Sequence, residues 1–124
     1  MRIIGKSNTR RVWVDGYELR PDHSQRLYSH SPDGFNWGYG GSGPAQLALA
    51  ILLRAGVEDG LAMDRHQDLK REFVALLPEG DFDETIEVRQ DGTWLWGKSE
   101  TDGDRIRRRI AEVDAARSDG RVSI

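Results

Sequence analysis

The chain has 124 residues, the size of one domain with a single hydrophobic core. It contains no cysteine, so thiol nucleophiles, cysteine zinc sites and disulfides are excluded. Charged residues make up 31% of the chain but nearly cancel to a net charge of −3, which argues against a general nucleic-acid binder. The longest apolar segment, around residues 45–53, is far shorter than the roughly 20 residues of a membrane span, and residues 1–11 lack a signal-like apolar run. We therefore expect a soluble cytoplasmic protein with no membrane partner.

The first element that the sequence predicts is a β-hairpin at residues 12–19. β-Branched and aromatic residues flank Asp15 and Gly16, a dipeptide that accommodates the positive φ angles of a two-residue turn. Ile3 and Ile4 favour a short strand before it. Residues 20–34 are rich in Pro, Ser, Asp and His, which is typical of a loop with room only for a short strand at residues 26–28.

The chain is organised around residues 35–56, which predict an aromatic strand at 35–39, a glycine turn and a helix at 44–55. Gln46 and Arg54 are the only polar side chains of this helix, so it has no solvent-facing stripe. A helix that is apolar on all sides is normally buried. The rest of the domain is therefore expected to surround it.

The ends of this helix are marked by residues that suit helix ends. Pro44 fits the first helical position, Ser42 or Gly43 the N-cap, and Gln46 can reach back to that cap. Gly56 is expected to end the helix, because glycine readily adopts the left-handed conformation found there.

A second helix is predicted at residues 64–77, with Asp64 as its cap and Pro78 as its end. Its apolar residues share one face at helical spacing, and they are Met63, His66, Leu69, Phe73, Leu76 and Leu77. The short connection makes the two helices an antiparallel pair in which the second covers one side of the first.

A second hairpin is predicted at residues 84–96, with Asp91 and Gly92 at its turn. Alternation places four apolar residues on one face, namely Ile86, Val88, Trp94 and Trp96. A third helix, capped by Thr101, is predicted over residues 101–117, and residues 118–124 are expected to be a mobile tail.

These elements predict an α+β fold for residues 1–117, organised as a single domain. In it, an antiparallel sheet made from the two hairpins and the 35–39 strand packs on the buried central helix, with the second and third helices flanking that helix. Placing the helices on one side of the sheet is the more economical arrangement.

The glycine-rich turn at residues 38–43 matches the dinucleotide-binding pattern G-x-G-x-x-G. A Rossmann unit also needs a second parallel strand after the helix, and here a polar turn leads to another helix, so we reject dinucleotide binding. A weaker anion site at Gly40, Gly41 and Ser42 remains, because N–H groups at a helix start attract anions. The simpler interpretation is that the glycines only permit a tight turn.

The densest basic cluster consists of Arg105, Arg107, Arg108 and Arg109. On a helix these side chains could track a phosphate backbone while Trp94, Trp96 or Trp37 stacked on bases. Acidic residues of the same segment nearly cancel the cluster and can pair with it, so a solvated, internally paired face is the alternative.

The histidines do not predict a metal site. His66 lies on an apolar helix face, where a hydrogen-bonded core histidine is expected. His23 and His30 share a loop with Asp22 and Asp33, but without a compact ligand spacing. The residues therefore predict no catalytic group, metal or cofactor.

The run W-G-Y-G-G-S-G-P-A-Q-L-A-L-A-I-L at residues 37–52, followed by D-L-K-R-E-F at 68–73 and L-L-P at 76–78, resembles an uncharacterised family of short proteins of prokaryotes, phages, plasmids and integrated elements. The resemblance covers residues 9–78 and transfers no catalytic residues. It implies a small accessory protein of mobile elements that acts on host or defence machinery. Residues 84–117 lie outside it.

Three functional hypotheses follow. The first is a non-enzymatic binding protein whose partner is another protein, since aromatic residues are in surplus and no catalytic constellation is visible. The second is nucleic-acid binding through the arginine cluster and Trp94 and Trp96. The third is a small-anion or nucleotide site at the glycine turn. The sequence leaves homo-oligomerisation open.

Overall fold

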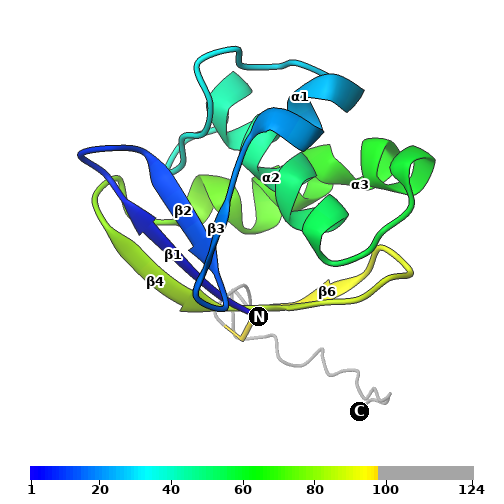
Figure 1. Ribbon diagram of the computed structural model, residues 1–124. Coiled ribbons are helices and arrows are strands. Elements are labelled where there is room, and N and C mark those ends of the chain that lie inside the picture. Colours follow the sequence, from blue (N-terminus) through cyan, green and yellow to red (C-terminus); the bar gives the residue numbers. More distant parts are fainter. Residues whose placement is uncertain (98–124) are drawn as a thin grey trace.

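The computed structural model describes residues 1–97, which contain a four-stranded sheet, a two-stranded ribbon and three α-helices (Figure 1). The strands are β1 (Arg2–Lys6), β2 (Arg11–Val14), β3 (Tyr17–Leu19), β4 (Phe82–Thr85), β5 (Glu87–Val88) and β6 (Trp94–Leu95). The helices are α1 (Asp22–Leu27), α2 (Ser42–Arg54) and α3 (Asp59–Glu72), and the short 3-10 helix η1 (Val74–Leu76) follows α3. The helix predicted at 101–117 and the tail predicted at 118–124 lie outside the described residues.

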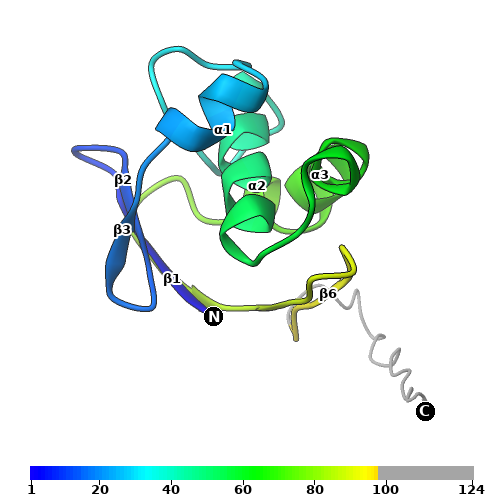
Figure 2. The ribbon, with the colours of Figure 1, turned by 45° about the vertical axis from the view of Figure 1, so that its right-hand side comes forward.

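The four-stranded sheet is antiparallel, with the strand order β3-β2-β1-β4. β1 is the strand predicted at Ile3 and Ile4, and it lies between β2 and β4. Its register pairs Ile3 with Val14 on one side and with Glu84 on the other. The helices lie on one face of this sheet (Figure 2). The predicted α+β class, with an antiparallel sheet packed on a buried helix, is confirmed.

The hairpin predicted at residues 12–19 is formed by β2 and β3. Both turn residues have positive φ angles, 51° at Asp15 and 88° at Gly16, as this two-residue turn requires. The Asp15 carboxylate accepts a hydrogen bond of 2.8 Å from the backbone N–H of Arg2, which ties the turn to β1. Local sequence chemistry was sufficient to place this element.

α2 is the buried helix that the apolar run predicts, since every residue from Gly43 to Leu52 is buried. Its start differs from the prediction. Gly41 is the N-cap and Pro44 is the third helical residue, where the missing N–H still costs no helical hydrogen bond. The end is confirmed, with Gly56 at a φ of 89°. Although α2 is apolar, neither it nor another helix within residues 1–97 is long and apolar enough to cross a membrane.

The strand predicted at residues 35–39 is wrong, because this segment is irregular and pairs with none of the described strands. It bonds instead to the chain after α3. The N–H of Gly38 donates to the carbonyl of Val74 at 3.1 Å, and the indole N–H of Trp37 donates to the carbonyl of Gly80 at 2.8 Å. Gly38 has a φ of 84°, and a Cβ added there would lie 3.1 Å from the Leu77 oxygen.

Residues 20–34 contain the helix α1, so the short strand predicted at residues 26–28 is wrong. Pro21 is the N-cap, with a φ of −75° that suits a helix start. Its carbonyl accepts hydrogen bonds of 2.9 Å from the backbone N–H of Gln25 and from the hydroxyl of Ser24. Two donors on one carbonyl hold the first turn of this polar helix.

α3 begins at Asp59, earlier than the predicted start at Asp64, because Glu58 is its N-cap. The Glu58 carboxylate accepts from the N–H groups of Gly60 at 2.8 Å and of Leu61 at 3.2 Å. After Glu72 the chain continues as η1 to Leu76. This break turns Leu76 away from the predicted apolar face, and it is 59% exposed.

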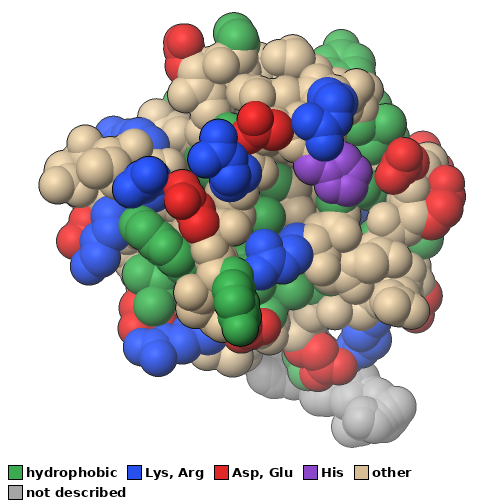
Figure 3. All heavy atoms as spheres, in the orientation of Figure 1, with side chains coloured by type: hydrophobic (Ala, Val, Ile, Leu, Met, Phe, Trp, Pro, Cys, Tyr) green, Lys and Arg blue, Asp and Glu red, His purple; other side chains and the backbone are tan. Residues whose placement is uncertain are grey.

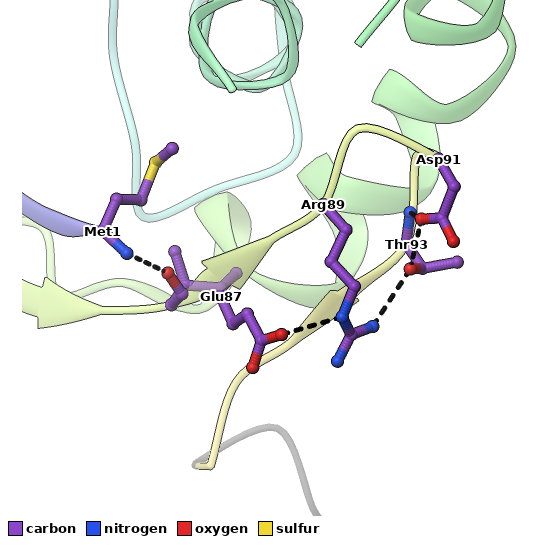
Figure 4. A network of polar contacts seen from close by, with 6 residues as sticks. Met1, Glu87, Arg89, Asp91 and Thr93 are labelled. Atoms are coloured by element: carbon purple, nitrogen blue, oxygen red, sulfur yellow. Dashed lines mark hydrogen bonds and ion pairs between the residues drawn. The ribbon is translucent and has the colours of Figure 1, made fainter. Parts of the chain in front are cut away.

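The hairpin predicted at residues 84–96 exists as the β5-β6 ribbon, which is separate from the four-stranded sheet. Its turn is longer than predicted, because the N–H of Gly92 donates back to the carbonyl of Arg89 at 3.0 Å. In Figure 4, Arg89 reaches both Glu87 and Thr93, and Thr93 bonds to Asp91. These polar contacts stabilise the turn.

The inward face of the ribbon is the one predicted. Ile86, Val88, Trp94 and Trp96 all pack against the core. Where β4 leads into the ribbon, the Met1 ammonium donates to the carbonyl of Ile86 at 2.7 Å (Figure 4). The ribbon thereby covers the side of α3 that the sheet does not reach (Figures 1 and 2).

Candidate functional site

The glycine turn before α2, where the sequence predicts an anion site, is exposed at Gly40 and Ser42. Within the first turn of α2, Ser42 and Gly43 carry N–H groups, whereas Pro44 has none. A Cβ added at Gly41 would lie 2.5 Å from the ring of Tyr39, so this ring covers part of the turn. The anion site at Gly40, Gly41 and Ser42 stays a prediction.

The residues predicted to bind nucleic acid are not brought together within residues 1–97. The arginines of that site lie outside this range, and they are Arg105, Arg107, Arg108 and Arg109. Trp96 is only 7% exposed, and its ring packs edge-on against Phe73 with centroids 4.8 Å apart. Trp94 is half-buried and donates its indole N–H to Glu72 at 3.0 Å. Both rings hold the ribbon in place, and nucleic-acid binding stays a prediction.

His66 is the buried, hydrogen-bonded histidine that the sequence predicts, and its partner is His30. Their Nε2 atoms are 2.8 Å apart, and Nδ1 of His66 lies 2.8 Å from the carbonyl oxygen of Met63. A carbonyl only accepts, so we assign the His66 proton to Nδ1 and the donating Nε2 proton to His30. The pKa of His30 is lowered from 6.5, first by burial and then by the nearby His66 and Lys70. The lowered pKa favours the neutral form of His30.

The histidines of the 20–34 segment do not converge on a metal site. His23 lines a cleft beside α1, whereas His30 contacts His66. No group of three or more His, Asp or Glu side chains arranged to hold a metal ion occurs within residues 1–97.

Gln46 is a fully buried amide, 0% exposed, at the point where α1 meets α2. Its oxygen accepts from the backbone N–H groups of His30 at 2.7 Å and of Ser31 at 3.0 Å. Its nitrogen donates to the Ser24 hydroxyl at 2.9 Å and to the Tyr28 carbonyl at 3.1 Å. These four bonds use the whole capacity of the amide. Gln46 thus anchors α1 and the segment after it, rather than the start of α2 as predicted.

The anchored α1 forms one wall of a cleft with a volume of about 280 Å³. The other walls are the end of β3 and the last turn of α2. The cleft has an apolar floor, since Leu19 and Ala50 are buried and Leu53 is half-buried. On the face formed by these elements, Figure 3 shows Lys and Arg side chains interspersed with Asp and Glu side chains, beside a His side chain and hydrophobic side chains.

Three arginines line this cleft, which we call the arginine cleft: Arg20 after β3, Arg26 on α1 and Arg54 at the end of α2. Arg20 is paired, with its Nε 3.2 Å from the Asp22 carboxylate. Neither Arg26 nor Arg54 has a carboxylate at salt-bridge distance within residues 1–97. Arg54 makes one long hydrogen bond, 3.4 Å, to the Val14 carbonyl. Within residues 1–97, both guanidinium groups are therefore without a carboxylate partner and available to an anion.

The two acidic residues that line the arginine cleft are already balanced. Glu18 pairs with Arg11 at 3.3 Å, outside the cleft. The pKa of Asp22 is lowered from 3.8, first by a hydrogen bond from its own backbone N–H, then by Arg20 and, to a smaller extent, by the charge of Arg26. Asp22 is thus ionised at pH 7 and offsets Arg20. When these two ion pairs are counted as neutral, Arg26 and Arg54 leave a local excess of two positive charges, on a chain whose net charge is −3.

The chemistry of the arginine cleft is suited to binding. Its hydroxyl group, on Ser24, donates to the Pro21 carbonyl and accepts from Gln46, so it serves the fold. Unpaired arginines above an apolar floor recognise an anionic group that carries some hydrocarbon. Sequence reasoning missed this site, because its arginines are far apart in the chain. The one signal was Gln46, a polar residue inside an otherwise apolar helix.

Among known proteins, the chain is similar to one family. The family of unknown function DUF6166 matches residues 4–97. This match is wider than the resemblance over residues 9–78, and it includes the β5-β6 ribbon. No curated protein and no solved structure matches the chain.

Proposed function

We propose that this chain, which belongs to the family of unknown function DUF6166, is a small non-enzymatic accessory protein that binds a protein partner. The observation that carries the proposal is the arginine cleft. It combines an apolar floor with two guanidinium groups that have no carboxylate partner in the described part of the chain, and hot spots of protein interfaces commonly include arginine beside apolar contacts. The resemblance to short proteins of phages and plasmids supports a mobile-element protein that acts on cytoplasmic host or defence machinery.

The charge of the arginine cleft favours an acidic or otherwise anionic surface on the partner. The chain as a whole is negative, so an anionic partner would be repelled elsewhere and attracted here. Nucleic acid is less well supported as the ligand, because Trp94 and Trp96 are engaged in packing and hydrogen bonding.

The test is affinity capture from the native host with the full chain, followed by mass spectrometry. The double variant Arg26→Gln/Arg54→Gln removes the two unpaired charges of the cleft. Its matched control is Arg65→Gln/Arg71→Gln, which removes two exposed charges on α3. We expect recovery of the partner to fall about tenfold or more with the cleft variant, and to be unchanged with the control.

Two results would contradict the proposal. One is equal recovery of the partner by the unmodified chain and by both double variants. The other is capture of nucleic acid without a specific protein. Circular dichroism and thermal unfolding of each variant establish that a lost partner does not reflect a lost fold.

A further inference from the structure

We infer that the arginine cleft binds a phosphate monoester carried on an apolar group, so that the partner is recognised through a phosphorylated side chain. This inference rests on the proposed function, since it names the group that the protein partner inserts. Three features of the cleft suit such a group: the two arginines, the apolar floor and the volume.

The charge of the arginine cleft favours a phosphate over a carboxylate. Once the Arg20–Asp22 and Arg11–Glu18 pairs are balanced, Arg26 and Arg54 leave an excess of two positive charges. A phosphate monoester carries about −1.5 to −2 at pH 7, whereas a carboxylate carries only −1. A phosphate therefore compensates the cleft more completely than an aspartate or glutamate side chain does.

The placement of the two arginines suits the geometry of a phosphate group. Arg26 comes from α1 and Arg54 from the last turn of α2, so the two guanidinium groups approach from different walls. A guanidinium is a planar fork of donors, and a phosphate offers three strong acceptor oxygens. Two forks from different directions can together engage the three oxygens, with one oxygen shared between them.

The apolar floor and the volume of the cleft suit the carbon skeleton that carries the phosphate. Leu19, Ala50 and Leu53 offer apolar contact to a carbon skeleton below the charged rim. The cleft volume of about 280 Å³ leaves room for one phosphorylated side chain with an aliphatic or aromatic body.

The α1 wall of the cleft is held in place by Gln46. Gln46 holds Ser24 at 2.9 Å and the Tyr28 carbonyl at 3.1 Å, which fixes both ends of α1 on the buried α2. The wall that carries Arg26 is thus positioned before any ligand arrives. A preorganised wall lowers the entropic cost of binding.

Direct titrations with defined probes test the inference at low salt. The probes are phenyl phosphate, inorganic phosphate and phenylacetate, and binding is followed by calorimetry and by NMR shifts of the full chain. We expect phenyl phosphate to bind about tenfold more tightly than phenylacetate and more tightly than inorganic phosphate. Arg26→Gln and Arg54→Gln should each weaken phenyl phosphate binding about tenfold, and Arg65→Gln should not change it.

A second experiment uses the protein partner itself. Treating the host lysate with a phosphatase before capture should abolish recovery of the partner by the full chain. The same treatment with an inhibited phosphatase should leave that recovery unchanged. This readout does not depend on the small probes.

The outcomes separate this inference from the proposed function. If phenylacetate binds as tightly as phenyl phosphate, or if phosphatase leaves a partner that still depends on Arg26 and Arg54, the phosphate inference is overturned and the protein-binding function stands. Equal binding of inorganic phosphate and phenyl phosphate would overturn the role of the apolar floor. If the variants change neither probe binding nor partner capture, both proposals fail.

Discussion

Replacing Gln46 by methionine removes four hydrogen bonds from the junction of α1 and α2 while nearly conserving the length and volume of the side chain. Two partly buried N–H groups, of His30 and Ser31, lose their acceptor. Each costs about 1–2 kcal/mol when left unsatisfied. Ser24 keeps its bond to Pro21, and the buried amide no longer has to be desolvated, which offsets part of the loss. We expect the free energy of unfolding to fall by about 2–4 kcal/mol.

The assay for Gln46→Met is urea unfolding followed by tryptophan fluorescence, since Trp37 and Trp96 are buried in the native core. For a domain of this size the same change lowers Tm by roughly 10 °C. Gln90→Met is the matched control, because Gln90 is an exposed amide on the β5-β6 ribbon. Its unfolding free energy should change by less than about 0.5 kcal/mol. A loss below about 1 kcal/mol for Gln46→Met would refute the anchoring role of this side chain.

Two further predictions concern the sheet and the histidine pair. Gly5→Ala should lower the unfolding free energy by about 1–3 kcal/mol in the same urea assay, because the new Cβ would lie 2.2 Å from the Phe82 ring. Gly80→Ala, which has open space around its Cβ, should be nearly neutral, and equal effects of the two changes would contradict this reasoning. Because the pKa of His30 is lowered in the folded chain, the unfolded chain takes up a proton on this imidazole at a higher pH than the folded chain does. Stability should therefore be full above about pH 6.5 and decline as the pH falls through the lower folded pKa, and His30→Asn should flatten that slope. Identical pH profiles would show that His30 does not titrate as proposed.

The elements that the sequence predicted correctly are those decided by a few neighbouring residues. The Asp15-Gly16 turn needs two positive φ angles, and few dipeptides tolerate them. The burial of α2 follows from its lack of a polar stripe, and Gly56 marks its end. In each case the cause and the outcome lie within one short segment.

The elements that the sequence did not predict are decided by distant contacts. Residues 35–39 have the composition of a strand, but Trp37 and Gly38 find their hydrogen-bond partners at Gly80 and Val74. α1 is short and polar, with little helical signal of its own, and it is held from outside by Gln46. Propensity is overridden in both segments by bonds that only the tertiary structure supplies.

The arginine cleft could not be predicted for a related reason. Arg20, Arg26 and Arg54 have no distinguishing feature in the sequence. The sequence alone does not show which arginines form salt bridges and which have no carboxylate partner. Only the pairing of Glu18 with Arg11 and of Asp22 with Arg20 identifies the two that remain. Gln46 was the one polar signal inside the apolar helix, but it was predicted to cap that helix, whereas the structure shows it holding α1.

The central place of β1 in the sheet has a consequence for the order of folding. β1 is the first strand of the chain, and its contact with β4 joins Arg2 to Asp83 across 81 residues. Closing a loop of this length costs roughly 2 kcal/mol more entropy than forming the neighbouring β1-β2 contact. During synthesis, one edge of β1 therefore stays open while β2, β3 and the helices form. The sheet closes over α2 only when β4 has left the ribosome, so this long-range pairing is expected to limit the folding rate.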